Sequence, residues 1–198
     1  MKKLIVGMSG ASGAPLTVEL LRQLQHCPEI ETELIMTESA KLTLLQETEF
    51  TVAEFCALAD HVYQNEKIGE RPASGSYRTM GMVIVPCSMK TLAGVVSGYS
   101  ENLLLRAADV TLKERRKLVM VTRECPFGTI HLRNMYEASK LGAVILPPML
   151  SYYQRPQSVE DCTGHIVGKI LDQFGIEGEG FRRWNGMEAG VYRDDERI

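Results

Sequence analysis

The sequence predicts an α/β fold: a Rossmann-like, three-layer α/β/α domain with a mostly parallel, doubly wound sheet. Short apolar segments typical of buried strands alternate with segments of helical periodicity. Small-residue loops and Gly or Pro mark many of the junctions between them. The chain of 198 residues is long enough to bury one core. Strands that alternate with helices form βαβ units, which place the strands parallel in one sheet.

The first half of the chain predicts three strands. They cover residues 3–8, 32–36 and 80–85. Helices are predicted over residues 15–25 and 38–46, with a short helical piece over 52–58, and residues 60–78 form a long polar excursion.

The second half predicts two more strands, over residues 117–121 and 143–146. Helices are predicted over residues 103–112, 131–141 and 159–174. We therefore expect one domain over residues 1–176, followed by an irregular tail, 177–198, that carries Trp184.

Composition excludes several classes of protein. The formal net charge of −3 argues against a nucleic-acid binder that relies on a basic face. No apolar run approaches the ~20 residues of a membrane span. The apolar start of the chain breaks into Ser9–Gly13 too early for a signal peptide, so we expect a cytoplasmic protein that binds no membrane.

The cysteines and histidines predict neither disulfides nor a metal site. The five cysteines are odd in number and widely spaced, without a Cys-x-x-Cys pair. The four histidines show no His-x-x-x-His spacing. We expect thiols in a reducing compartment and no bound metal.

Two loops that follow predicted strands are candidates for binding an anion. Gly7–Pro15 is rich in glycine, which lets the backbone approach a phosphate or ring, and Ser12 could cap the next helix or donate to a ligand. Pro86–Gly94 places two hydroxyls and Lys90 at the start of another helix. Each loop is also explained by a capped helix without a ligand.

Two further segments carry charged and aromatic side chains. Arg123 and Glu124 fall at the carboxyl end of an apolar strand, where ligands bind in such sheets. Tyr152, Tyr153 and Arg155 follow the strand over 143–146, where they suit a pocket wall or a subunit contact equally well. Trp184 is the only tryptophan, and taken alone it predicts an anchor that holds the tail on the core.

Taken together, these loops resemble the UbiX-type flavin prenyltransferases, over nearly the whole predicted domain. The segments that carry the resemblance are Val6–Gly13, Pro86–Gly94, Arg106–Arg116 and Tyr153–Gln157. The resemblance implies a homo-dodecamer with flavin sites between subunits. It implies transfer of a dimethylallyl group from its monophosphate to N5 and then C6 of reduced FMN, without a metal, and delivery of prenylated FMN to a UbiD-type decarboxylase.

The resemblance also implies roles for particular residues. The flavin-binding residues would be Gly10, Ala11, Ser12, Thr37, Ser88, Met89, Lys90, Thr91 and Arg123. The prenyl phosphate would be held by Lys113, Arg123, Tyr153 and Lys169, with Glu47 nearby. Glu124 would take the proton released at C6, directly or through Ser12, and Trp184 would cover the prenyl chain.

These residue types suit the implied chemistry. A leaving phosphate needs fixed cations when no magnesium is present. Developing positive charge on an allyl group is stabilised by aromatic faces. Two departures stand out: Lys169 replaces the usual arginine, and Cys125 follows Glu124 where relatives carry threonine.

Two other functions compete with this one. An FMN-dependent decarboxylase of aromatic acids or of peptidyl-cysteine shares the fold. It does not need the cations Lys113, Arg123 and Lys169. Storage of FMN would leave Glu124, Lys113 and Trp184 without a role.

Overall fold

A computed structural model describes residues 1–186. Its six strands form one sheet in which every neighbouring pair is parallel. The strands are β1 (Lys2–Met8), β2 (Ile30–Met36), β3 (His61–Gln64), β4 (Gly81–Cys87), β5 (Lys117–Thr122) and β6 (Val144–Ile145). The order β3-β2-β1-β4-β5-β6 reverses direction between β1 and β4, so the sheet is doubly wound as predicted.

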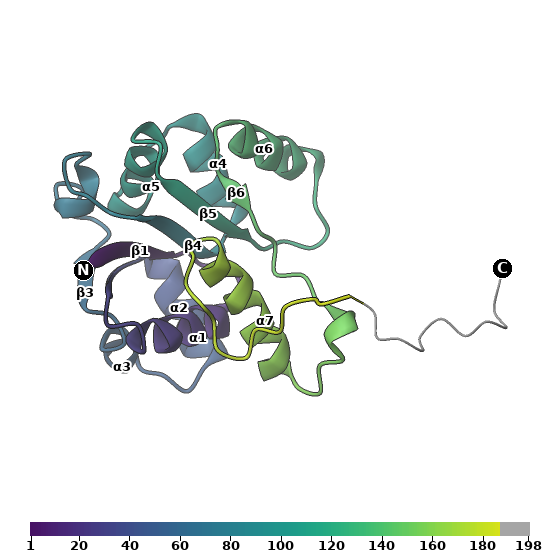
Figure 1. Ribbon diagram of the computed structural model, residues 1–198. Coiled ribbons are helices and arrows are strands. Elements are labelled where there is room, and N and C mark those ends of the chain that lie inside the picture. Colours follow the sequence, from purple (N-terminus) through teal and green to yellow (C-terminus); the bar gives the residue numbers. More distant parts are fainter. Residues whose placement is uncertain (187–198) are drawn as a thin grey trace, which may run out of the picture.

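Helices cover both faces of the sheet (Figure 1). One face packs against α1 (Ala14–Gln25), α2 (Glu38–Glu47), α3 (Val52–Cys56) and α7 (Val159–Asp172). The other packs against α4 (Met89–Ser97), α5 (Leu103–Lys113) and α6 (Thr129–Lys140). Alternate residues of a strand face opposite sides, so Leu34 and Val83 join the first core while Ile35 and Ile84 join the second.

The polar excursion at residues 60–78 contains a strand that the sequence analysis missed. β3 pairs with β2 from Glu33↔His61 to Met36↔Gln64. It is four residues long and alternates half-buried with exposed side chains, so it lacks the apolar run that marks a buried strand. The rest of this excursion holds a 3₁₀ turn, η1 (Arg71–Ala73), that packs on α5.

None of the helices within residues 1–186 has the length and apolar character that a membrane span requires.

A buried carboxylate anchors this excursion to the sheet. Glu33 on β2 is fully buried, and its Oε1 accepts a hydrogen bond from the Tyr77 hydroxyl. Lys3 Nζ donates to the same hydroxyl at 2.7 Å and lies 3.9 Å from Glu33 Oε1. The Arg116 guanidinium also binds this excursion: it donates hydrogen bonds to the carbonyls of Gly75 and Tyr77, each at 2.7 Å.

Replacing Tyr77 by phenylalanine is expected to lower the free energy of unfolding by about 2–4 kcal/mol, because a buried carboxylate loses its hydroxyl donor. Urea unfolding followed by circular dichroism measures this loss. Tyr99→Phe is the matched control, since Tyr99 is 61% exposed. Equal stabilities of the two variants would contradict the anchoring role of the Tyr77–Glu33 contact.

The segment after α7 packs back onto the domain. Glu179 N donates to Gln23 Oε1 of α1 at 3.0 Å. Phe181 lies against Gly168 of α7, where a Cβ would come within 2.4 Å of the Phe181 Cβ. The first part of the predicted tail, residues 177–181, thus lies against α1 and α7. Its last part, residues 187–198, lies outside the described residues.

Candidate active site

The loops after β1 and β4 meet at the point where the strand order reverses, and a buried serine joins them. Ser9 is 1% exposed. Its Oγ donates to Pro86 O at 2.8 Å and accepts from Ser88 N at 2.7 Å. Ligands of doubly wound sheets bind at this switch point, outside the carboxyl ends of the strands.

A cavity of about 270 Å³ lies over these loops. It is lined by Ser9, Gly10, Thr37, Ser39, Ser88, Lys90, Thr91, Asn102, Leu104 and Leu105. Thr37, Ser88 and Asn102 each cap a helix with the side-chain oxygen, so the starts of α2, α4 and α5 all face this region. Gly10 has no room for a side chain, because a Cβ there would lie 2.3 Å from the Ser39 Cβ.

Five of the nine residues predicted to bind flavin line this cavity: Gly10, Thr37, Ser88, Lys90 and Thr91. Met89 instead packs against the core on the α4 and α5 side of the sheet. The sequence analysis missed Ser9, Ser39, Asn102, Leu104 and Leu105. Ser39 and Asn102 had a detectable signal, since each is a short polar residue at a helix start.

Glu47, the last residue of α2, binds the backbone at the end of the loop after β1. Its Oε2 accepts from the backbone amides of Gly13 at 2.8 Å and Ala14 at 2.9 Å. Partial burial raises the pKa of Glu47, but the hydrogen bonds from Ser12 and from these two amides, together with the charge of Arg123, outweigh it and hold the pKa below its ordinary value. The structure thus brings Ser12, Glu47 and Arg123 together.

Glu47→Gln is expected to lower the free energy of unfolding at pH 7 by about 1–2 kcal/mol, because the amides lose a charged acceptor. A carboxyl whose folded pKa is depressed stabilises above its unfolded pKa and loses that contribution as the pH falls through the folded value. The difference between wild type and Glu47→Gln should therefore shrink below about pH 4.3. Urea unfolding at pH 7 and pH 4 measures it, and an equal difference at both pH values would contradict the assignment.

Arg123 and Glu124 line a second cavity, of about 310 Å³, together with Thr122, Cys125, Pro126, Phe127, Pro147, Pro148 and Met149. The Arg123 amide donates to Cys87 O at 3.0 Å, which fixes the end of β5 beside β4. Glu124 Oε1 accepts from Cys125 N at 3.0 Å. Arg123 and Glu124 thus lie at the carboxyl edge of the sheet, as predicted from their place after a strand.

Tyr153 and Trp184 lie together on the outer side of α7. Their rings meet edge to face with centroids 5.3 Å apart. Lys169 Nζ lies 6.0 Å from the Phe181 ring, and its charge contributes to lowering the pKa of His165, which is due first to burial. His165 in turn contacts Tyr153 at 6.0 Å between centroids. The predicted donor-site residues Tyr153, Lys169 and Trp184 therefore form one cluster.

Lys113 is separated from all of these residues within one chain. It ends α5, whose 11 residues span about 16 Å away from the cavity that Leu104 and Leu105 line. Its Nζ bonds to Glu114 Oε1 at 2.5 Å, beside Gly75. This end of α5 leads into the start of β5, whereas Arg123 follows the end of β5. A site containing both groups needs a second subunit.

Comparison with known proteins decides the family. The model of the family described as Flavoprotein matches residues 1–172. A probable UbiX-like flavin prenyltransferase of Sedimentibacter hydroxybenzoicus is 53% identical over 94% of this chain and 98% of its own length. The flavin prenyltransferase UbiX of Escherichia coli K12 is 50% identical over 94% of this chain and 100% of its own length.

The chain belongs to the Flavoprotein family, among the UbiX-like flavin prenyltransferases.

Solved structures of UbiX-like proteins have the same fold. AnUbiX (PadA1), in complex with FMN and dimethylallyl pyrophosphate, matches with a TM-score of 0.92 at 44% identity, over 94% of this chain and 99% of that one. A dodecameric FMN-dependent UbiX-like decarboxylase from E. coli O157:H7 matches with a TM-score of 0.92 at 50% identity, over 93% and 100%. The predicted Rossmann-like fold and the resemblance are both confirmed for this UbiX-like chain.

Proposed function

We propose that this protein is a flavin prenyltransferase that joins the dimethylallyl group of dimethylallyl monophosphate to reduced FMN. The observation that carries the proposal is its 50% identity to E. coli UbiX along that protein's whole length. The AnUbiX complex, which contains FMN and a dimethylallyl ester, supports the two substrates. The product would be prenylated FMN, which a UbiD-type decarboxylase would use.

The residues at the switch point fit a flavin nucleotide. The missing side chain at Gly10 lets a flat ring approach the backbone beside Ser39. The hydroxyls of Thr37, Ser88 and Thr91 offer hydrogen bonds around the same cavity, and Lys90 offers positive charge. The flavin would supply the ring atoms N5 and C6 that take the dimethylallyl group. The amides of Gly10, Ala11 and Ser12 and the Arg123 guanidinium would complete the binding site.

The chain's charged residues would handle the phosphate and the proton. The C–O bond of the donor breaks, so the departing phosphate needs cations, which Arg123, Lys169 and Lys113 of another subunit would provide along with the Tyr153 hydroxyl. In the second step the C=C bond of the N5-bound prenyl group would take up a proton and bond to C6, and the proton lost from C6 would be accepted by Glu124 directly or by way of Ser12 and Glu47. Trp184, against Tyr153, would cover the apolar prenyl chain and exclude water.

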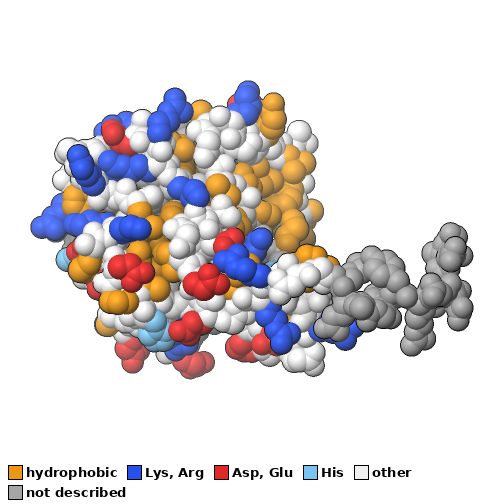
Figure 2. All heavy atoms as spheres, in the orientation of Figure 1, with side chains coloured by type: hydrophobic (Ala, Val, Ile, Leu, Met, Phe, Trp, Pro, Cys, Tyr) orange, Lys and Arg blue, Asp and Glu red, His pale blue; other side chains and the backbone are white. Residues whose placement is uncertain are grey.

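An oligomer would assemble the complete site, and we propose a dodecamer such as that of the E. coli O157:H7 protein. Large apolar side chains are exposed on α6 and on the loop after β6, among them Ile130, Tyr136 and Met149, each more than 60% exposed. Figure 2 shows apolar side chains gathered on this side of the molecule. An exposed patch of this kind is typical of a subunit contact.

Mass spectrometry tests the proposed reaction directly. The protein is incubated anaerobically with reduced FMN and dimethylallyl monophosphate, without added metal. The expected product is FMN heavier by one prenyl unit. Recovery of unchanged FMN from protein that binds FMN would overturn the transferase function.

Decarboxylation is the second candidate, since the E. coli O157:H7 relative is described as an FMN-dependent decarboxylase. It predicts release of CO₂ from an aromatic acid by the protein and FMN alone, without a prenyl donor. The same incubation with ferulic or 4-hydroxybenzoic acid in place of the donor separates the two functions.

A further inference from the structure

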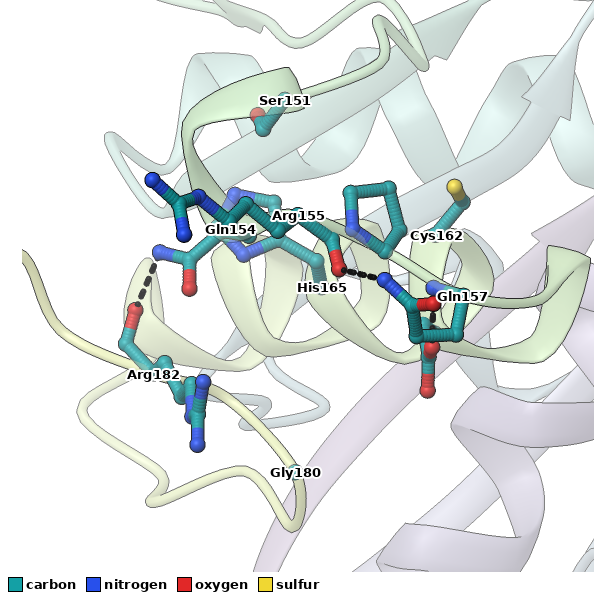
Figure 3. A pocket seen from close by; sticks show the side chains of 10 residues that line it. Ser151, Gln154, Arg155, Gln157, Cys162, His165, Gly180 and Arg182 are labelled. Atoms are coloured by element: carbon teal, nitrogen blue, oxygen red, sulfur yellow. Dashed lines mark hydrogen bonds between the residues drawn. The ribbon is translucent and has the colours of Figure 1, made fainter.

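A separate cavity, of about 370 Å³, lies beside the start of α7. Its walls come from the loop with the 3₁₀ turn η2 (Tyr152–Gln154), from the first turns of α7 and from the segment after it (Figure 3). The lining residues are Ser151, Gln154, Arg155, Pro156, Gln157, Asp161, Cys162, His165, Gly180 and Arg182. None of the proposed flavin or donor residues is among them.

The cavity is lined by two guanidinium groups, those of Arg155 and Arg182. Neither Arg155 nor Arg182 forms an ion pair within residues 1–186. The one carboxylate in the lining, Asp161, accepts from the backbone amides of Gln157 at 2.7 Å and Ser158 at 3.2 Å. Its charge is thus directed to the start of α7 rather than to either arginine. An anion is the ligand that two such cations favour.

His165 adds a hydrogen-bonding group to the lining of the cavity. It is 8% exposed, lines the cavity and makes no hydrogen bond to any residue that the structure describes. Its ring contacts are to the apolar edges of Tyr153 and Phe181. Burial, followed by the charge of Lys169, lowers the pKa of His165, so the ring is neutral at pH 7 and has one N–H to donate. This N–H is available to a ligand oxygen in the cavity.

Two glutamine side chains donate to the backbone carbonyls of the arginines, and one of these bonds joins the two segments. Gln154 Nε2 donates to Arg182 O at 3.0 Å, and Gln157 Nε2 donates to Arg155 O at 2.8 Å. In Figure 3 the Arg155 and Arg182 side chains lie on the same side of the pocket, with the Gln154–Arg182 bond between them. The η2 loop and the Gly180–Arg182 segment are therefore already joined where a ligand would bridge them.

We propose that this cavity is a second anion site, which binds a small organic phosphate between Arg155 and Arg182 with His165 as a hydrogen-bond donor. Two guanidinium charges match a phosphate monoester better than a singly charged carboxylate. A cavity of about 370 Å³ accommodates an organic group as well as the phosphate. The ligand would tie the η2 loop to the segment that leads into Trp184. This inference goes beyond the proposed transfer reaction and does not depend on it.

Trp184 provides the readout, because it is the only tryptophan in the chain and its ring meets Tyr153 of η2. The full-length protein, free of flavin, is titrated at constant ionic strength with glycerol 3-phosphate, inorganic phosphate or acetate. Tryptophan fluorescence and titration calorimetry follow binding. We expect saturable binding of glycerol 3-phosphate with a Kd at or below about 1 mM, and weaker binding of acetate.

Arg155→Gln and Arg182→Gln are each expected to weaken this binding about tenfold or more, since a charge-assisted pair is lost. Arg183→Gln is the matched control: Arg183 is adjacent in the chain, but its guanidinium pairs with Asp172 at 2.8 Å and Glu177 at 3.2 Å. Lys113→Gln removes a cation of the proposed donor site without touching the lining of this cavity, and it should leave binding unchanged. Absence of saturable binding, a loss with Lys113→Gln but not with Arg155→Gln, or tighter binding of acetate would each overturn the proposal.

Discussion

Replacing Glu124 by glutamine is expected to slow prenyl transfer by about 10²–10⁴-fold, the usual contribution of a positioned general base. The amide keeps the size of the side chain and an acceptor for Cys125 N, but it cannot take the proton from C6. Glu124 lies in the cavity with Pro147 and Pro148 rather than in the one formed by Gly10 and Ser88. The affinity for FMN should therefore change little.

Single-turnover assays of prenylated FMN measure this effect, and quenching of flavin fluorescence measures FMN binding. Glu137→Gln is the control, because that carboxylate pairs with Lys140 on the surface of α6. A rate for Glu124→Gln within threefold of that of Glu137→Gln would remove Glu124 from the mechanism.

Lys113→Gln is expected to lower the rate by about 10²–10³-fold through the loss of one cation at the leaving phosphate. Arg115→Gln changes the same charge two residues further on and should have little effect. Because Lys113 ends α5 at the opposite edge of the sheet from Arg123, its contribution must come from a neighbouring subunit.

Complementation makes that geometry testable. Lys113→Gln and Glu124→Gln remove groups that would belong to different subunits of one site. Co-expression of the two inactive variants should therefore give mixed oligomers in which some sites contain both native residues. Activity well above the sum of the separate variants is expected. Mixed oligomers with no such activity would place the two groups in one chain and contradict the shared site.

Most of the fold could be predicted because its core strands are apolar on both faces. β1, β4 and β5 are each fully or nearly fully buried, which gives the continuous apolar runs visible in the sequence. β3 lies at the edge of the sheet and its side chains alternate, so its four residues resemble a loop. The strand predicted over residues 143–146 is shorter in the structure, where only Val144 and Ile145 of β6 pair with β5. Leu146 makes one further hydrogen bond, from its amide to Met120 O, and the pairing ends there.

The candidate site was predictable where its residues come directly after predicted strands. Gly10, Thr37, Ser88 and Thr91 follow strands, and the topology brings strand ends together. Ser9 was missed because its hydrogen bonds reach 77 and 79 residues along the chain, to Pro86 and Ser88. The pairing of Tyr153 with Trp184 depends on how the segment after α7 folds back, which no local pattern specifies.

The close contact between Gly168 and Phe181 helps to position the segment that carries Trp184. A helix normally presents side chains all round, yet here one missing methyl group creates the seat for an aromatic ring thirteen residues later. The Trp184 indole follows Phe181 by three residues, so its position depends on the surface of α7 as well as on its own contact with Tyr153. Changes of sequence on that face of α7 are therefore expected to shift the indole while the cavity beside Gly10 and Ser88 stays unchanged.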